Sequence, residues 1–176
     1  LDLNREAFGE GPLTIERVAM ALAVFQASQL YDPNTLWDRH LRGEAELDAR
    51  QRQGAELFFG RANCASCHGG ALLTDQAFHN LAVPLFGPGK LGFSVDRGRY
   101  AITLKRSDFY HFKTPSLRNV EHTAPYMHNG SARTLEDAIG HHVDPKRSLS
   151  TYRGEHLSQD LRGDIRSRFA AIRENM

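Results

Sequence analysis

The sequence lacks the features of several large classes of protein, and each absence narrows what it can be. Its 176 residues contain no run of 18 apolar residues, which excludes a membrane-spanning helix. Lysine and arginine number 22 against 21 for aspartate and glutamate, and no block of one sign occurs, so nothing indicates nucleic-acid binding. Only two cysteines are present, which excludes the spread disulfide framework of small secreted proteins.

The start of the chain is also unusual. Its first residue is Leu1, with no initiator methionine and no signal peptide, and we expect the chain to be a fragment of a longer protein. Its length corresponds to one sizeable domain, and hydrophobic residues make up 40%, which is enough for a modest core.

Apolar residues recur at helical spacing in four parts of the sequence. These parts are Thr14 to about Leu30, about Glu46 to Phe59, Thr134 to about His142, and a last segment from near Ser158 that carries Leu161, Ile165 and Phe169. Between 69 and 113, glycine and proline interrupt every apolar run, which predicts a long irregular stretch of the kind that usually serves a function. No convincing strand pair or repeat is present, so we predict a mainly α fold.

Both cysteines lie in one pentapeptide, Cys64-Ala65-Ser66-Cys67-His68, which matches the haem c attachment pattern C-x-x-C-H. The spacing fits the chemistry, because two thiols add to the vinyl groups of neighbouring pyrrole rings. The adjacent histidine then lies under the iron and donates an imidazole nitrogen to it. The following Gly69-Gly70 lets the backbone pass close to the macrocycle.

Two other interpretations of a C-x-x-C pair are a redox dithiol and half of a zinc site. The dithiol belongs in a βαβ setting, which the sequence does not show. A zinc site needs a second ligand pair at regular spacing, and no second cysteine pair exists. We therefore predict one mainly α, cytochrome c-like haem domain with long irregular loops, spanning 1–176.

A haem that transfers electrons usually has a second axial ligand, for which nine histidines and three methionines compete. One face of the third predicted helix carries Leu135, Ala138, Ile139 and His142. His142 therefore extends the face expected to be buried, whereas His141 points about 100° away from it. Met127 is a competitor of similar standing, because methionine is a common haem ligand.

Five short segments carry a resemblance to a known family. They are Phe112-Lys113-Thr114-Pro115-Ser116-Leu117-Arg118-Asn119-Val120, Thr123-Ala124-Pro125-Tyr126-Met127-His128-Asn129-Gly130, Thr74-Asp75, Phe78-His79-Asn80 and Asp96-Arg97-Gly98-Arg99. Together they resemble the bacterial dihaem cytochrome c peroxidases and the related MauG proteins, over nearly the whole chain. The first two segments are similar to the C-terminal haem domain of that family.

The resemblance implies that this haem is the electron-transfer centre. Its distal ligand in the family comes from the helix after the P-Y-x-H-x-G segment and is Met in the peroxidases or Tyr in MauG. The matching position here is His142, with Met127 as the alternative. A bis-histidine iron lacks the thioether that raises the potential, so we expect a comparatively low reduction potential.

The resemblance also implies a calcium ion, bound in part by two backbone carbonyls that match Thr123 and Pro125. A further ligand would come from an N-terminal domain, so the site is expected to be incomplete in this chain. Arg99 and Arg118 are candidates to pair with the haem propionates, since arginine binds carboxylates bidentately. An ordinary turn and ordinary ion pairs are the alternative interpretations of these residues.

Only one C-x-x-C-H occurs, so the peroxide-reducing haem of the family is expected to lie in an N-terminal haem domain absent from this chain. That domain and a small redox protein that donates electrons are the expected partners, while a homodimer stays open. A free-standing mono-haem electron carrier and half of a MauG-like enzyme, oxidising a protein or an organic substrate, are the alternatives. Haem c attachment and the resemblance both indicate the periplasm.

Overall fold

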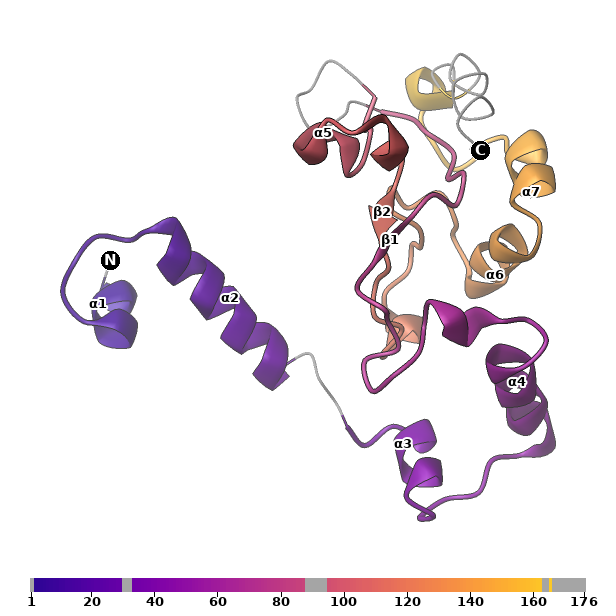
Figure 1. Ribbon diagram of the computed structural model, residues 1–176, viewed down its shortest axis with the longest axis horizontal. Helices are drawn as coiled ribbons and strands as arrows, with labels where there is room; N and C mark the ends of the chain where they lie inside the picture. Colours follow the sequence, from indigo (N-terminus) through magenta and orange to yellow (C-terminus); the bar gives the residue numbers. More distant parts are fainter. Residues whose placement is uncertain (1, 30–32, 88–94, 163–164, 166–176) are drawn as a thin grey trace. The chain divides into compact units, whose positions relative to one another are not determined.

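The computed structural model describes residues 2–29, 33–87, 95–162 and 165 (Figure 1). The chain forms two compact units, Leu1–Arg52 and Gln53–Met176. The cysteine motif and every candidate site residue lie in the second unit. None of the described helices is long and apolar enough to cross a membrane.

The first unit contains α1 (Asp2–Phe8), α2 (Ile15–Gln29), α3 (Leu36–Leu41) and the start of α4 (Ala49–Phe59). Helix α2 begins where the sequence predicts, since the Arg17 amide donates to Thr14 Oγ1 at 3.3 Å. Its expected end at Leu30 lies outside the described residues. Neither α1 nor α3 was expected, because each is too short to show apolar periodicity.

Helix α4 begins later than the predicted Glu46, because Asp48 caps it. The Gln51 amide donates to Asp48 Oδ1 at 2.8 Å, and the Asp48 amide donates to Gln51 Oε1 at 2.9 Å. This reciprocal pair satisfies two backbone donors at the start of the helix. The helix ends at Phe59 as predicted, one residue before Gly60 and shortly before the cysteine motif.

In the second unit the described part of 69–113 is largely irregular, as predicted, but it contains one strand pairing that the sequence did not reveal. Strand β1 (Phe78–His79) pairs antiparallel with β2 (Phe112–Lys113), so that His79 lies opposite Phe112. A strand of two residues carries no period-two pattern, which explains why it was missed. A short helix, α5 (Tyr100–Thr103), and a 3-10 turn, η2 (Arg106–Asp108), fill the segment before β2.

Helix α6 (Leu135–Val143) begins as predicted with a capping box, in which Thr134 and Asp137 exchange side-chain and backbone hydrogen bonds. It is followed directly by α7 (Pro145–Thr151), which packs against it (Figure 1). Of the last predicted helix, the backbone is helical at 159–162 and at 165, and Phe169 lies outside the described residues.

The core of the second unit gathers buried side chains from loops and from α7. It comprises Ala82, Leu85, Tyr110 and Leu149, with Val95, Phe109 and Phe112 packed against them. Loop residues supply most of this core, so the irregular segments are held in place by burial of their own apolar side chains.

Candidate functional site

The cysteine motif folds into a single helical turn. Its 3-10 segment, η1 (Cys64–Ser66), follows Asn63 in the left-handed conformation with φ of 55°. The amides of Cys67 and His68 both donate to the Cys64 carbonyl, at 3.3 and 2.9 Å. Both thiols are half-buried and free, and this turn fixes them beside His68.

Glycine is required at the end of this turn. A Cβ atom built on Gly69 would lie 2.8 Å from the carbonyl oxygen of Ala65, a distance that real side chains do not reach. Gly69 therefore permits the chain to turn back directly after His68.

The imidazole of His68 is held in one tautomer. Its Nδ1–H donates to the Leu73 carbonyl at 3.2 Å, which leaves Nε2 as the nitrogen with the lone pair. Burial lowers the pKa of His68 below its ordinary value, against the opposing effect of the bond to Leu73. The ring is thus favoured in the neutral form, which is the form that binds metals.

The imidazole of His142, on α6, lies edge-on beside that of His68. Their ring centroids lie 6.2 Å apart and the ring planes are rotated by 63°. A metal–imidazole bond is about 2 Å long and the ring centre lies about 1.1 Å from its nitrogen, so an ion bound between two imidazoles separates the centroids by roughly 6 Å. The observed separation therefore fits one iron atom held between the two rings.

His142 is also held in the tautomer that a ligand needs. Its Nδ1 lies 2.8 Å from the Ala138 carbonyl one helical turn earlier, so Nδ1–H donates there and Nε2 keeps its lone pair. Histidines that bind metals nearly always donate their other ring N–H to a carbonyl, a carboxylate or water. Both rings of the pair have this arrangement.

Apolar residues close in sequence to the two histidines are exposed. Ile139 and Val143 on α6 are 60% and 77% exposed, and Leu72, next to the Leu73 that accepts from His68, is 46% exposed. Exposed aliphatic side chains on the segments that carry the two imidazoles suit a flat, apolar macrocycle, so the residues present fit haem.

The predicted burial of α6 was wrong in one respect. The structure buries Ala138 and His141, which is only 4% exposed, and turns Ile139 and His142 outward. His141 Nε2–H donates to the Leu81 carbonyl at 2.7 Å, and its Nδ1 accepts from Ser148 Oγ at 2.9 Å. These two bonds draw His141 into the core and use both of its nitrogens, so His141 has none left for a metal.

The alternative ligand Met127 lies elsewhere. It is half-buried in a turn with φ of 69° and lines a cavity of about 780 Å³ between α6, α7 and the segment 152–156. That cavity is lined by His141 but by neither His68 nor His142. In the structure, therefore, the imidazole of His142 lies next to that of His68, whereas Met127 lines the cavity.

The two candidate arginines are held by different partners. Arg118 Nε–H donates to the Ala71 carbonyl at 2.9 Å, in the loop that follows His68. Arg99 Nε lies 3.3 Å from Asp108 Oδ2, and its guanidinium lies 4.4 Å from the centroid of the Phe78 ring. Arg118 is thus held to the loop after His68, and Arg99 to Asp108.

Thr123 and Pro125 are exposed and follow the short turn η3 (Val120–His122). The Thr123 hydroxyl donates to the Val120 carbonyl at 3.1 Å, so its side chain closes this turn.

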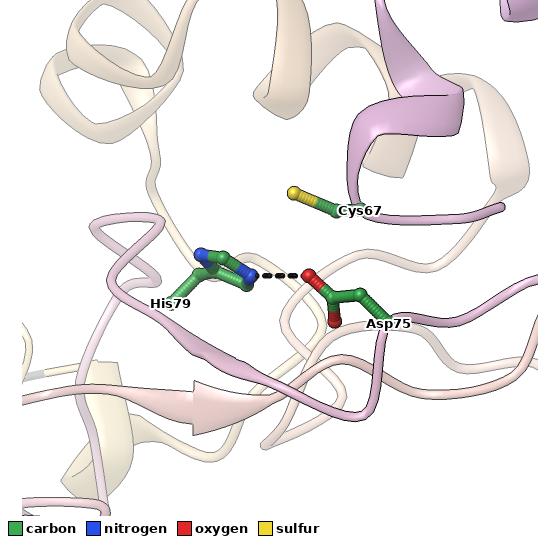
Figure 2. Close-up of side chains that lie close together, drawn as sticks. All are labelled: Cys67, Asp75 and His79. Atoms are coloured by element: carbon green, nitrogen blue, oxygen red, sulfur yellow. Dashed lines mark hydrogen bonds and ion pairs between the residues drawn. The ribbon is translucent and has the colours of Figure 1, made fainter.

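A group that sequence reasoning missed lies beside Cys67 (Figure 2). Cys67, Asp75 and His79 place their sulfur, oxygen and nitrogen atoms within 4.8 Å of one another. Asp75 Oδ2 lies 2.8 Å from His79 Nε2, and the Asp75 amide donates to the Cys67 carbonyl at 2.7 Å. The segments containing Asp75 and His79 were noted, but in a loop no periodicity signals that the two side chains meet.

Comparisons with known proteins decide the family. The chain is 37% identical to the methylamine utilization protein MauG of Methylorubrum extorquens over 143 residues, which cover 80% of this chain and 38% of that protein. It is 34% identical to the cytochrome c551 peroxidase of Pseudomonas aeruginosa over 142 residues, 79% of this chain and 40% of that one. The chain belongs to the family of MauG and the bacterial cytochrome c peroxidases.

A solved structure agrees with this assignment. A MauG-like protein associated with microbial copper homeostasis superposes with a TM-score of 0.60 at 32% identity, covering 77% of this chain and 45% of its own. No family model matches the sequence. The chain spans about two fifths of the length of these MauG and peroxidase relatives, and membership of their family implies that it binds haem c.

Proposed function

We propose that residues 1–176 are the C-terminal, electron-transfer haem domain of a dihaem cytochrome c peroxidase or MauG-like oxidoreductase. One haem c is attached through Cys64 and Cys67, and its iron is bound by His68 and His142. The observation that carries the proposal is the 6.2 Å separation of the two imidazoles, each with its Nδ1–H given to a backbone carbonyl.

The haem supplies an iron that can gain and lose one electron. His68 and His142 would both bind this iron, and an iron bound by both imidazoles would transfer electrons rather than reduce peroxide. Because neither ligand is a thioether, the pair stabilises the ferric state and keeps the potential comparatively low. The apolar side chains beside the rings exclude water from the macrocycle.

The remaining residues have supporting roles in this proposal. Arg118, fixed to the loop after His68, and Arg99 pair with the haem propionates, since guanidinium groups bind carboxylates strongly. The backbone oxygens of Thr123 and Pro125 contribute to a calcium ion whose other ligands lie outside this chain. The isolated chain should then bind calcium only weakly.

In the full protein this domain passes electrons to, or stores an oxidising equivalent for, a peroxide-reducing haem in an N-terminal domain. The proposed electron donor is a small redox protein, and the proposed compartment is the periplasm. The peroxidases and MauG both support the assignment. Whether the enzyme reduces peroxide or oxidises another substrate is a property of the full protein.

The test is to produce the chain with the haem c maturation machinery, beside a C64A/C67A variant. The wild type should keep its haem on a denaturing gel, accept electrons from a reduced small cytochrome, and show no peroxide turnover. The variant should lose the covalent pigment. Peroxide turnover by the isolated chain would contradict the electron-transfer role, and haem that separates on the gel would contradict attachment at the two cysteines.

A further inference from the structure

Asp75 and His79 form an acid–imidazole pair beside Cys67 (Figure 2). The Asp75 amide donates to the Cys67 carbonyl at 2.7 Å, which fixes the carboxylate against the second cysteine. Asp75 Oδ1 accepts from the Ala77 amide at 2.8 Å, and Oδ2 accepts from His79 Nε2 at 2.8 Å. The orientation of both side chains is thereby set by the backbone.

The carboxylate of Asp75 keeps its negative charge. Its pKa is lowered to about 2, chiefly by the hydrogen bond from His79 and then by that from the Ala77 amide. Since Asp75 is ionised, His79 Nε2 carries a hydrogen and donates it, and a second proton on this imidazole must go to Nδ1. The His79 side chain is 40% exposed, so Nδ1 can exchange protons with water.

This pair lies close to where the haem edge begins. The sulfur of Cys67 is within 4.8 Å of the interacting atoms of Asp75 and His79, and in the proposed function that sulfur is bonded directly to the macrocycle. At such distances a unit charge changes the free energy of a neighbouring charge change, even where water screens part of the interaction.

We propose that Asp75 and His79 form a proton-binding site coupled to the electron that arrives at the haem. Reduction places one electron, supplied by an external reductant, on the ferric iron, and the added negative charge favours a proton from water on His79 Nδ1. Asp75 is the positioning residue, because its fixed carboxylate orients the imidazole and stabilises the imidazolium. This inference rests on haem attachment at Cys67.

Other charged groups also lie around His79. Lys113 flanks it on the paired strand, and Arg99 lies over the neighbouring Phe78. The ring opposite in register, Phe112, stacks on His128, whose Nε2 lies 2.9 Å from Asp96 Oδ2.

His128 and Asp96 provide a matched control pair. They repeat the same contact at 2.9 Å with side chains 43% and 36% exposed. Among the described residues, however, this pair does not join a cysteine in a cluster of potential metal ligands.

The test is the midpoint potential of the haem-loaded chain, measured by spectroelectrochemistry from pH 5 to 9. In wild type the potential should fall from pH 5 to pH 9, because a proton on His79 favours the reduced haem. In H79Q it should lie below wild type at pH 5 and meet it at pH 9, because only the charged imidazole is missing. In D75N it should lie above wild type at pH 9, because a negative charge has been removed. H128Q should follow the wild-type curve.

Reduction in unbuffered solution gives a second readout, since H79Q should take up fewer protons per electron than wild type. An H79Q curve parallel to wild type, or an H128Q variant that alone loses the pH dependence, would overturn the inference while leaving haem attachment intact. A chain that attaches no haem would overturn the proposed function together with it.

Discussion

His142 lies on α6 and His68 in the loop after η1, yet each gives its Nδ1–H to a backbone carbonyl nearby in the sequence, Ala138 for one and Leu73 for the other. Local hydrogen bonds thus orient both rings before any ligand binds, and their centroids meet at 6.2 Å. Preorganised ligands of this kind bind a metal with less loss of side-chain freedom.

Replacing His142 should change the spin state or the reduction potential of the haem iron. In H142A the ferric haem should become high-spin and bind cyanide, because one axial position opens. In H142M the reduction potential should rise, because a thioether replaces an imidazole. Absorption spectra and a redox titration measure both, and a low-spin H142A protein would show that another side chain, such as Met127, is the ligand.

Replacing the adjacent His141 should destabilise the fold and leave the haem iron unchanged. H141A removes two buried hydrogen bonds and leaves the Leu81 carbonyl without its donor, so the free energy of unfolding should fall by about 2–4 kcal/mol. The absorption spectrum should stay that of wild type. Urea unfolding followed by circular dichroism measures the loss, and a changed spin state in H141A would count against the assignment of His142.

Acid should destabilise the fold partly through Asp75. Its folded-state pKa is lowered from 3.8 to about 2, first by the hydrogen bond from His79, so its contribution is present above pH 4 and is lost as pH falls from about 4 to 2. D75N should be less stable than wild type at pH 6, and the gap should close towards pH 2. Urea midpoints at several pH values test this, and a gap that is constant with pH would exclude Asp75 as its source.

Gly69 should be intolerant of a side chain. G69A would place a methyl group 2.8 Å from the Ala65 oxygen and distort the haem turn, so the unfolding free energy should fall by about 1–3 kcal/mol and less haem should be attached. Gly54 is the control, because a Cβ there, within α4, meets nothing within 4 Å and alanine favours a helix. Haem staining per unit of protein compares the two variants with wild type.

Local signals predicted much of this structure. The start of α6 at Thr134 and the end of α4 at Phe59 each depend on neighbouring residues, so the sequence was sufficient to place them. Which face of α6 is buried depended instead on Leu81 and Ser148, whose bonds to His141 no helical periodicity reveals.

The Asp75–His79 contact was unpredictable for a related reason. Asp75 lies in irregular chain and His79 in a strand of two residues, where the direction of a side chain is set by individual backbone bonds such as that from the Asp75 amide to Cys67. The two-residue strands β1 and β2 were likewise too short for any pattern. Loops that gain their order from tertiary contacts are therefore where the sequence was least informative.

The most direct measurement is the absorption spectrum of the haem-loaded chain, ferric and ferrous, recorded with and without cyanide. If His68 and His142 bind the iron, both states should be low-spin, and cyanide added to the ferric protein should leave its spectrum unchanged. A high-spin ferric spectrum that shifts on adding cyanide would contradict the account, because it would show an open position where His142 should be.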